Sequence, residues 1–182
     1  HQEERLEREL GQYREEEATC NGCAGYPKYD QVTGLLSFNR FREEVDSVIA
    51  SGKGKSCLLV YTDLENFKYF NRKYGYAAGD QLLREFTGYI IDTLKKRNTA
   101  HFTRVVADQF ILFFEEKWNN GSIEAIKRIN NGFIERQQRK YPEAKLRLRT
   151  GVYKVEKDCD GASFAIDAAN YARRQKSEAK RS

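Results

Sequence analysis

The chain has 182 residues, a net charge of +5 at pH 7 and an isoelectric point of about 9.0, and it is long enough for one well-packed domain with a tail. The charge is mildly basic, which suits a phosphorylated ligand but is too weak to indicate nucleic-acid binding. The apolar runs are only a few residues long, so we expect neither a transmembrane helix nor a signal peptide.

Residues 1–28 are predicted to form a linker that precedes the domain. Residues 1–19 are strongly charged, and Leu6, Leu10 and Tyr13 recur at helical spacing. This pattern fits either the end of a signalling helix from an upstream sensor, as in a coiled coil, or a frayed terminus. Because the chain begins with histidine and contains no Met, we expect a fragment of a longer protein. We expect it to be a cytoplasmic domain, with a membrane-anchored receptor as one possible parent.

Cys20 and Cys23 form a CxxC pair, a spacing found in zinc sites and in redox-active dithiols. No second CxxC or CxxH follows, and the only histidines are His1 and His101. A complete zinc site is therefore not expected. Reduced cytosolic thiols are the simpler interpretation.

The first part of the domain is predicted to be a turn, a helix and a buried strand. Asp30–Leu35 contains turn formers, and Ser37 is suited to cap a helix that ends at about Ala50. The apolar residues 58–61 then lead into Asp63. A continuous apolar run that ends in an acid is typical of a buried strand that presents a carboxylate at the rim of a sheet.

A short helix is predicted after this strand, because Phe67, Phe70 and Tyr74 recur at steps of three and four residues. We expect the glycines of residues 75–79 to break it and Asp80 to cap the helix that follows.

The polar residues around this helix suit a metal-bound nucleotide. Asp63 is followed by Lys68 and Asn71. Carboxylates hold Mg²⁺, lysine pairs with phosphate, and asparagine or aspartate can read the hydrogen-bonding edge of a base. The simpler alternatives stay open: Lys68 as a solvated helix lysine, and Asp80 as a helix cap only.

The remaining chain alternates helices with strands. An amphipathic helix is expected from Asp80 to Leu94, a β-hairpin over 101–106 and 110–115, and then a helix, a strand and a helix over 123–139, 146–155 and 162–175. This order predicts an α+β domain in which helices cover a mostly antiparallel sheet.

Three stretches resemble the GGDEF family of diguanylate cyclases: DQVTGL at 30–35, DLENFKYFNRKYGYAAGD at 63–80 and RVVADQF at 104–110. The third carries VADQF, residues 106–110, where the family has Gly-Gly-Asp-Glu-Phe. The resemblance implies the ferredoxin-like fold of nucleotidyl cyclases over residues 29–176. It leaves 177–182 as a linker toward a possible downstream domain.

The resemblance also implies a role for each matching position. The metal, Mg²⁺ or Mn²⁺, would be held by Asp63, the backbone carbonyl of Leu64, and Asp108, which is also the candidate catalytic acid. The nucleotide, GTP, would be contacted by Asn66, Phe67 and Lys68 at its phosphates, by Asn71 and Asp80 at guanine, and by Val106 and Ala107 in place of the family's glycines.

The signature turn carries the departures from the family. Val106 and Ala107 place side chains where glycines allow a close approach of the nucleotide. Neutral Gln109 replaces an acid implicated in metal binding and catalysis, so Asp108 is not expected to support cyclisation. The family's product-inhibition motif, Arg-x-x-Asp, is reduced to Arg97 with Ala100 in the acidic position. Lys176 is the nearest match to a basic residue that clamps phosphate near the last helix.

Three functions follow from these patterns. The favoured one is an inactive domain that binds Mg-GTP or GDP and regulates a neighbour, such as an EAL phosphodiesterase downstream, with a sensor upstream and a possible homodimer. The alternatives are an active diguanylate cyclase and a nucleotide-free interaction or dimerisation module. Nucleic acid is not an expected partner.

Overall fold

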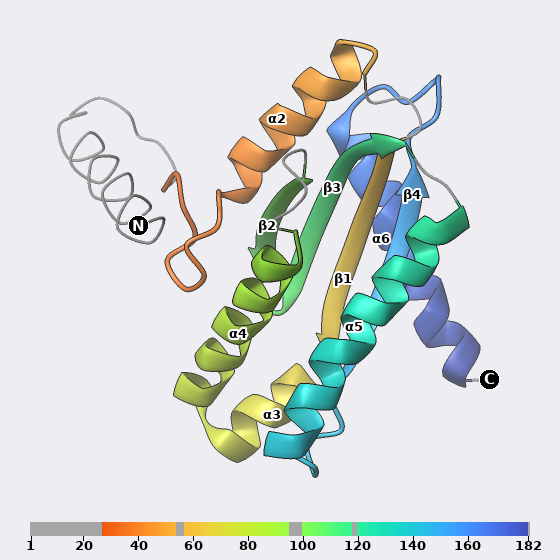
Figure 1. Cartoon of the computed structure of the whole chain (residues 1–182). Helices are drawn as coiled ribbons and strands as arrows, with labels where there is room; N and C mark the ends of the chain where they lie inside the picture. Colours follow the sequence, from red (N-terminus) through yellow and green to blue (C-terminus); the bar gives the residue numbers. More distant parts are fainter. Residues whose placement is uncertain (1–26, 54–56, 95–99, 118–119, 182) are drawn as a thin grey trace, which may run out of the picture.

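The computed structural model describes residues 27–53, 57–94, 100–117 and 120–181. They form a four-stranded antiparallel sheet in the order β2-β3-β1-β4, with helices on both faces (Figure 1). The elements in chain order are α2 (Phe38–Ala50), β1 (Cys57–Glu65), α3 (Phe67–Tyr74), α4 (Tyr76–Leu94), β2 (Ala100–Val106), β3 (Gln109–Lys117), α5 (Asn120–Lys140), β4 (Arg147–Lys154) and α6 (Ala162–Arg181).

The predicted α+β fold and its order of elements are confirmed. Ser37 caps α2 as expected, since its side chain accepts a hydrogen bond from the backbone N–H of Arg40. The predictions for the N-terminal helix, for Cys20 and Cys23, and for Arg97 fall outside the described residues.

Alternate residues of β1 build two separate cores. Leu58, Val60 and Leu64 face α3, α4 and α5, where Phe86 of α4 lies with its ring centroid 5.0 Å from that of Phe133 of α5. Phe67 and Phe70 of α3 belong to the same core, so this packing fixes α3 beside the end of β1.

The second core lies on the opposite face, between the sheet and helices α2 and α6. Leu59 and Tyr61 of β1 pack there with Phe41 of α2 and with Ala165 and Ala169 of α6. The small residues of α6 let its backbone lie close to β4. Gly151 on β4 is essential to this approach, because a Cβ added there would overlap the backbone of α6 at Ala169 and Arg173.

Gly151→Ala is therefore expected to destabilise the domain by about 2 kcal/mol, because the added methyl forces the helix away from the sheet. Urea unfolding followed by circular dichroism measures this loss. Gly88→Ala on α4 is the matched control: its added Cβ meets open space, and alanine favours helix by about 0.5–1 kcal/mol. Equal stability of the two variants would contradict the close packing of α6.

Two sequence predictions about boundaries are wrong. Asp80 does not cap a helix, because α4 begins at Tyr76 and only Gly75, with φ of 92°, separates it from α3. Strand β1 does not end at Asp63 but continues to Glu65. Asp63 is consequently paired within the sheet and has a residue of β4 directly opposite it.

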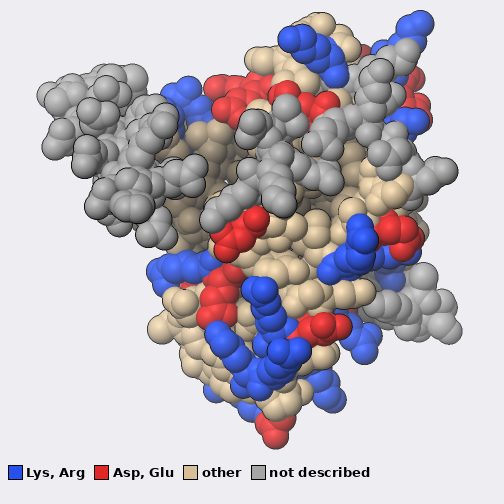
Figure 2. Space-filling view, in the orientation of Figure 1, with Lys and Arg blue, Asp and Glu red and all other residues tan. Residues whose placement is uncertain are grey.

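Charges of both signs lie on the face shown in Figure 2, with lysine and arginine gathered toward the end where α3 lies. Some of the basic groups on these helices are paired: Lys73 of α3 with Glu143, and Lys140 of α5 with Glu85 at 2.8 Å. Within the part of the chain that the structure describes, none of the helices has the length and apolar character needed to cross a membrane.

Candidate functional site

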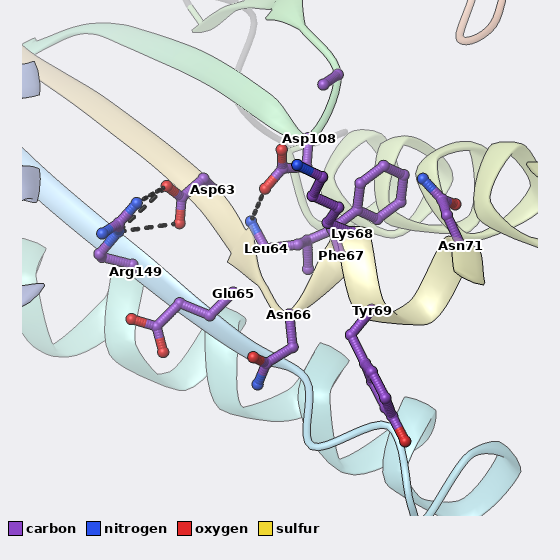
Figure 3. A pocket seen from close by; sticks show the side chains of 11 residues that line it. Asp63, Leu64, Glu65, Asn66, Phe67, Lys68, Tyr69, Asn71, Asp108 and Arg149 are labelled. Atoms are coloured by element: carbon purple, nitrogen blue, oxygen red, sulfur yellow. Dashed lines mark hydrogen bonds and ion pairs between the residues drawn. The ribbon is translucent and has the colours of Figure 1, made fainter. Parts of the chain in front are cut away.

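A cavity of about 860 Å³ lies where the end of β1, the start of α3 and the β2–β3 turn meet (Figure 3). Most of the predicted site residues line it: Asp63, Leu64, Asn66, Phe67, Lys68, Asn71, Ala107 and Asp108. Two do not: Val106 is 59% exposed, and Asp80 lies along α4. Three lining residues were not predicted: Glu65, Tyr69 and Arg149.

The start of α3 presents backbone donors to this cavity. Asn66, directly before the helix, is left-handed with φ of 69° and makes no side-chain cap. Its side-chain amide instead donates to the carbonyl of Lys145 at 2.7 Å. The first N–H groups of α3, from Phe67 and Lys68, lack intrahelical acceptors, and a helix N-terminus of this kind attracts phosphate.

Asn71 carries an unsatisfied acceptor. Its Oδ1 atom is buried and has no hydrogen-bond partner among the described residues. Gly79 of α4 leaves the space that the Asn71 amide occupies, because a Cβ at that glycine would overlap Oδ1. A buried carbonyl oxygen without a donor costs free energy in the ligand-free protein, so this amide is suited to a ligand that brings an N–H group.

The β2–β3 turn is held by the segment that carries the first family motif. Arg104 donates from Nε to the carbonyl of Ala107 at 2.7 Å and forms an ion pair with Asp30 at 3.1 Å. Asp30 also accepts hydrogen bonds from the amide and hydroxyl of Thr33. Although burial alone would raise it, the pKa of Asp30 is lowered because these bonds and Arg104 favour the carboxylate. Ala107 adopts φ of 49°, a conformation that favours glycine.

Asp108 points from the turn toward β1 (Figure 3), where its Oδ2 atom accepts a hydrogen bond from the backbone N–H of Leu64 at 3.1 Å. Burial, together with the negative charge of Asp63, raises the pKa of this carboxyl group.

Gln109 is directed into the protein rather than into the cavity. Its Oε1 atom accepts a hydrogen bond from the hydroxyl of Tyr61 at 2.7 Å, and Tyr61 belongs to the core beneath α2 and α6. The position at which the family has an acid therefore supplies no charge to the site.

Asp63 is buried and paired with two arginines. Arg149, directly opposite on β4, donates to both carboxylate oxygens, with Nη2 at 2.5 Å and Nε at 3.1 Å from Oδ2 (Figure 3). Arg173 of α6 donates from Nη1 to Oδ2 as well. The side chains of Asp63 and Arg173 are each 5% exposed. Two positive charges thus compensate one carboxylate.

The sequence contained one signal for this cluster. Ile166, Ala169 and Arg173 share the buried stripe of α6, so helical spacing alone places a guanidinium against the sheet. Arg149 has no comparable signal, because its position depends on the register between β1 and β4.

The predicted metal site stays a prediction, and the residues present do not fit a divalent cation well. Asp63 is engaged by two guanidinium groups, Asp108 is bonded to a backbone amide, and Gln109 is neutral and turned away. Across the described ranges, no three histidine, cysteine, aspartate or glutamate residues gather where a metal ion could be held.

The family model "Diguanylate cyclase, GGDEF domain" matches residues 27–182. Diguanylate cyclase DgcS of Shewanella oneidensis is 32% identical over 89 residues, which are 48% of this chain and 29% of that protein. Cyclic di-GMP phosphodiesterase PdeR of Escherichia coli is 28% identical over 130 residues, 71% of this chain and 18% of that protein. The chain thus spans less than a third of either relative.

Among solved structures, the GGDEF domain of DgcB from Caulobacter crescentus, in complex with c-di-GMP, superimposes with a TM-score of 0.70 at 17% identity. The match covers 88% of this chain and 94% of that one. This likeness establishes the fold. The match of the family model, which spans all of the described residues, shows that the protein belongs to the diguanylate cyclase GGDEF domain family.

Proposed function

We propose that this domain binds a guanine nucleotide without cyclising it and uses the bound state to regulate an adjacent domain. The observation that carries the proposal is Asn71, which lines the cavity and whose Oδ1 atom, buried beside Gly79, has no hydrogen-bond partner among the described residues. Guanine presents N–H donors at N1 and N2, whereas adenine has an acceptor at N1 and only a C–H group at position 2. An acceptor from Asn71 at this edge of the base would therefore select guanine, and Asp80, near Gly79 on α4, would support the same base.

The phosphates would lie at the start of α3. The backbone N–H groups of Phe67 and Lys68 and the Lys68 ammonium group supply positive potential to the cavity that Asn71 also lines. This arrangement accommodates GTP or GDP. Ala107, which lines the cavity with a methyl group, and Val106 at the rim of the turn limit how closely the hairpin approaches the nucleotide.

The absence of cyclisation follows from the charges in the turn. Cyclisation requires the 3′-hydroxyl of one nucleotide to attack the α-phosphate of another, and the family position for an acid here holds Gln109, bonded to Tyr61. An amide cannot accept the hydroxyl proton. Because two identical half-sites would have to meet, a homodimer would carry the defect twice.

Regulation of a neighbouring domain is the role that remains for a binding site without turnover. PdeR of Escherichia coli, to which this chain is similar, is a cyclic di-GMP phosphodiesterase, so an EAL-type domain downstream is our proposal for the regulated partner. A sensor upstream of residues 1–28 and a cytoplasmic location belong to the same proposal.

The test is a calorimetric titration of GTP, GDP and ATP into the 182-residue chain, with chromatography of the mixture afterwards. We expect both guanine nucleotides to bind at least about tenfold more tightly than ATP, because ATP leaves the Asn71 oxygen without a donor. We expect no cyclic dinucleotide to form. Cyclic di-GMP in the mixture would establish the cyclase alternative. If no nucleotide at millimolar concentration produced heat, nucleotide binding would be ruled out in favour of the interaction or dimerisation module.

A further inference from the structure

The carboxylate on which a metal would depend is already neutralised by the chain. Asp63 receives Nε and Nη2 of Arg149 and Nη1 of Arg173, so both of its oxygens accept hydrogen bonds from guanidinium groups. These are charge-assisted bonds in a buried setting, which makes them stronger than contacts between neutral groups. A cation that approached Asp63 would have to displace them.

Both arginines are fixed in place by the fold rather than by chance contact. Arg149 is the cross-strand neighbour of Asp63 in the β1–β4 register. Arg173 is brought to the sheet by the close approach of α6 over Gly151. There its guanidinium donates to Asn170 at 2.7 Å and lies over the ring of Tyr61 at 4.8 Å. Neither guanidinium therefore depends on a bound ligand for its position.

The charge balance of the site follows directly. Without arginines, Asp63 and Asp108 would present two negative charges, which favour a divalent cation. With Arg149 and Arg173 included, the formal charges of these four side chains sum to zero, and the neutral Gln109 adds no charge. A divalent cation that approached Asp63 would then be repelled by two fixed positive charges. Arg149 also lines the cavity, so its positive charge faces the same space as Lys68.

We propose that Arg149 and Arg173 take the place of the divalent cation, so that the domain binds its guanine nucleotide without a metal. The proposal rests on the nucleotide-binding function proposed above. Arg149 supplies charge to the phosphates directly, because guanidinium matches phosphate geometry. Arg173, which is buried, is a positioning residue: it pairs with Asp63, the same carboxylate that Arg149 contacts.

The first measurement compares GDP binding in a magnesium buffer with binding in an EDTA buffer by calorimetry. GDP is the probe because it cannot be cyclised. We expect dissociation constants that agree within about threefold, since the counter-charge is part of the protein. A loss of more than about tenfold in EDTA would overturn the proposal.

The matched variants are Arg149→Ala and Arg147→Ala. Arg147 lies on the same strand and is exposed, so its removal subtracts the same charge away from the cavity. We expect Arg149→Ala to weaken GDP binding about tenfold in EDTA and to recover part of this loss in magnesium, while Arg147→Ala leaves both affinities near those of the wild type. Equal GDP affinities of the two variants would show that Arg149 does not contact the phosphates.

A second readout does not need the nucleotide. Electron paramagnetic resonance of free Mn²⁺ measures whether the ligand-free protein takes up the cation. We expect no uptake at millimolar Mn²⁺. Uptake by the wild type that disappears in Asp63→Asn would overturn the proposal that the arginines replace the cation. If GDP binds in neither buffer, the proposed function fails, and the Mn²⁺ measurement still decides the charge argument.

Discussion

Asp63→Asn is expected to lower the free energy of unfolding by about 3–4 kcal/mol, the largest loss anticipated for a single polar side chain of this domain. Asparagine keeps the shape of aspartate but removes the charge that compensates Arg149 and Arg173. Arg173 has a side chain that is only 5% exposed, so water cannot replace the lost partner. Breaking a buried pair by removing one member leaves an uncompensated charge in a low-dielectric setting. Urea unfolding followed by circular dichroism measures the loss.

The control is Asp167→Asn, which changes the same charge at an exposed position on α6. It is expected to alter stability by no more than about 0.5 kcal/mol. Arg173→Met introduced into Asp63→Asn should restore part of the stability, because the unpaired charge is then gone and an apolar side chain fills its space. A loss below about 1 kcal/mol for Asp63→Asn would indicate that both arginines find compensation elsewhere.

Asn71→Ala is expected to weaken guanine nucleotide binding about 100-fold while leaving the ligand-free domain as stable as the wild type or slightly more stable. The two effects have different causes. Binding loses the acceptor for the guanine N–H groups, whereas the free protein loses a buried oxygen that has no partner among the described residues. A residue that serves only the fold would instead cost stability when it is truncated.

The measurements are GDP titration calorimetry and thermal unfolding of the nucleotide-free protein. Asn131→Ala, which removes an exposed amide on α5, is the control and should leave affinity unchanged. Asn71→Asp keeps an acceptor and is expected to retain more affinity than the alanine variant. Unchanged affinity in Asn71→Ala would remove this residue from base recognition.

Most of the fold was accessible from sequence because its signals are local. Apolar periodicity identified every helix and strand that the structure describes, and the continuous run before Asp63 marked the central strand. The exceptions are boundaries. Asp80 is a residue type that often caps helices, yet α4 begins at Tyr76, and Ala78 and Gly79 of its first turn pack against the core and α3. Local propensity competes with tertiary packing at such places, and packing prevails.

The site was accessible only in part, for a different reason. Lys68, Asn71 and Asp108 could be predicted to lie around one cavity because they fall within the stretches that resemble the family. The partners of Asp63 were not found, because Arg149 and Arg173 are separated from it by 86 and 110 residues and belong to no motif. Cross-strand register and the approach of α6 over Gly151 bring them together. Such contacts are a property of the assembled fold.

The ion-pair cluster at Asp63 also bears on how the proposed binding role could be reversed by mutation. Restoring an acid at Gln109 alone would add negative charge to a site whose central carboxylate is still occupied by two guanidinium groups. Losing Arg173 first would leave Asp63 partly uncompensated and lower stability before any gain in activity. If the domain binds without turnover, as proposed, neither change alone is expected to restore cyclase chemistry. Reversal of the proposed role would then require changes at the turn and at the arginines together.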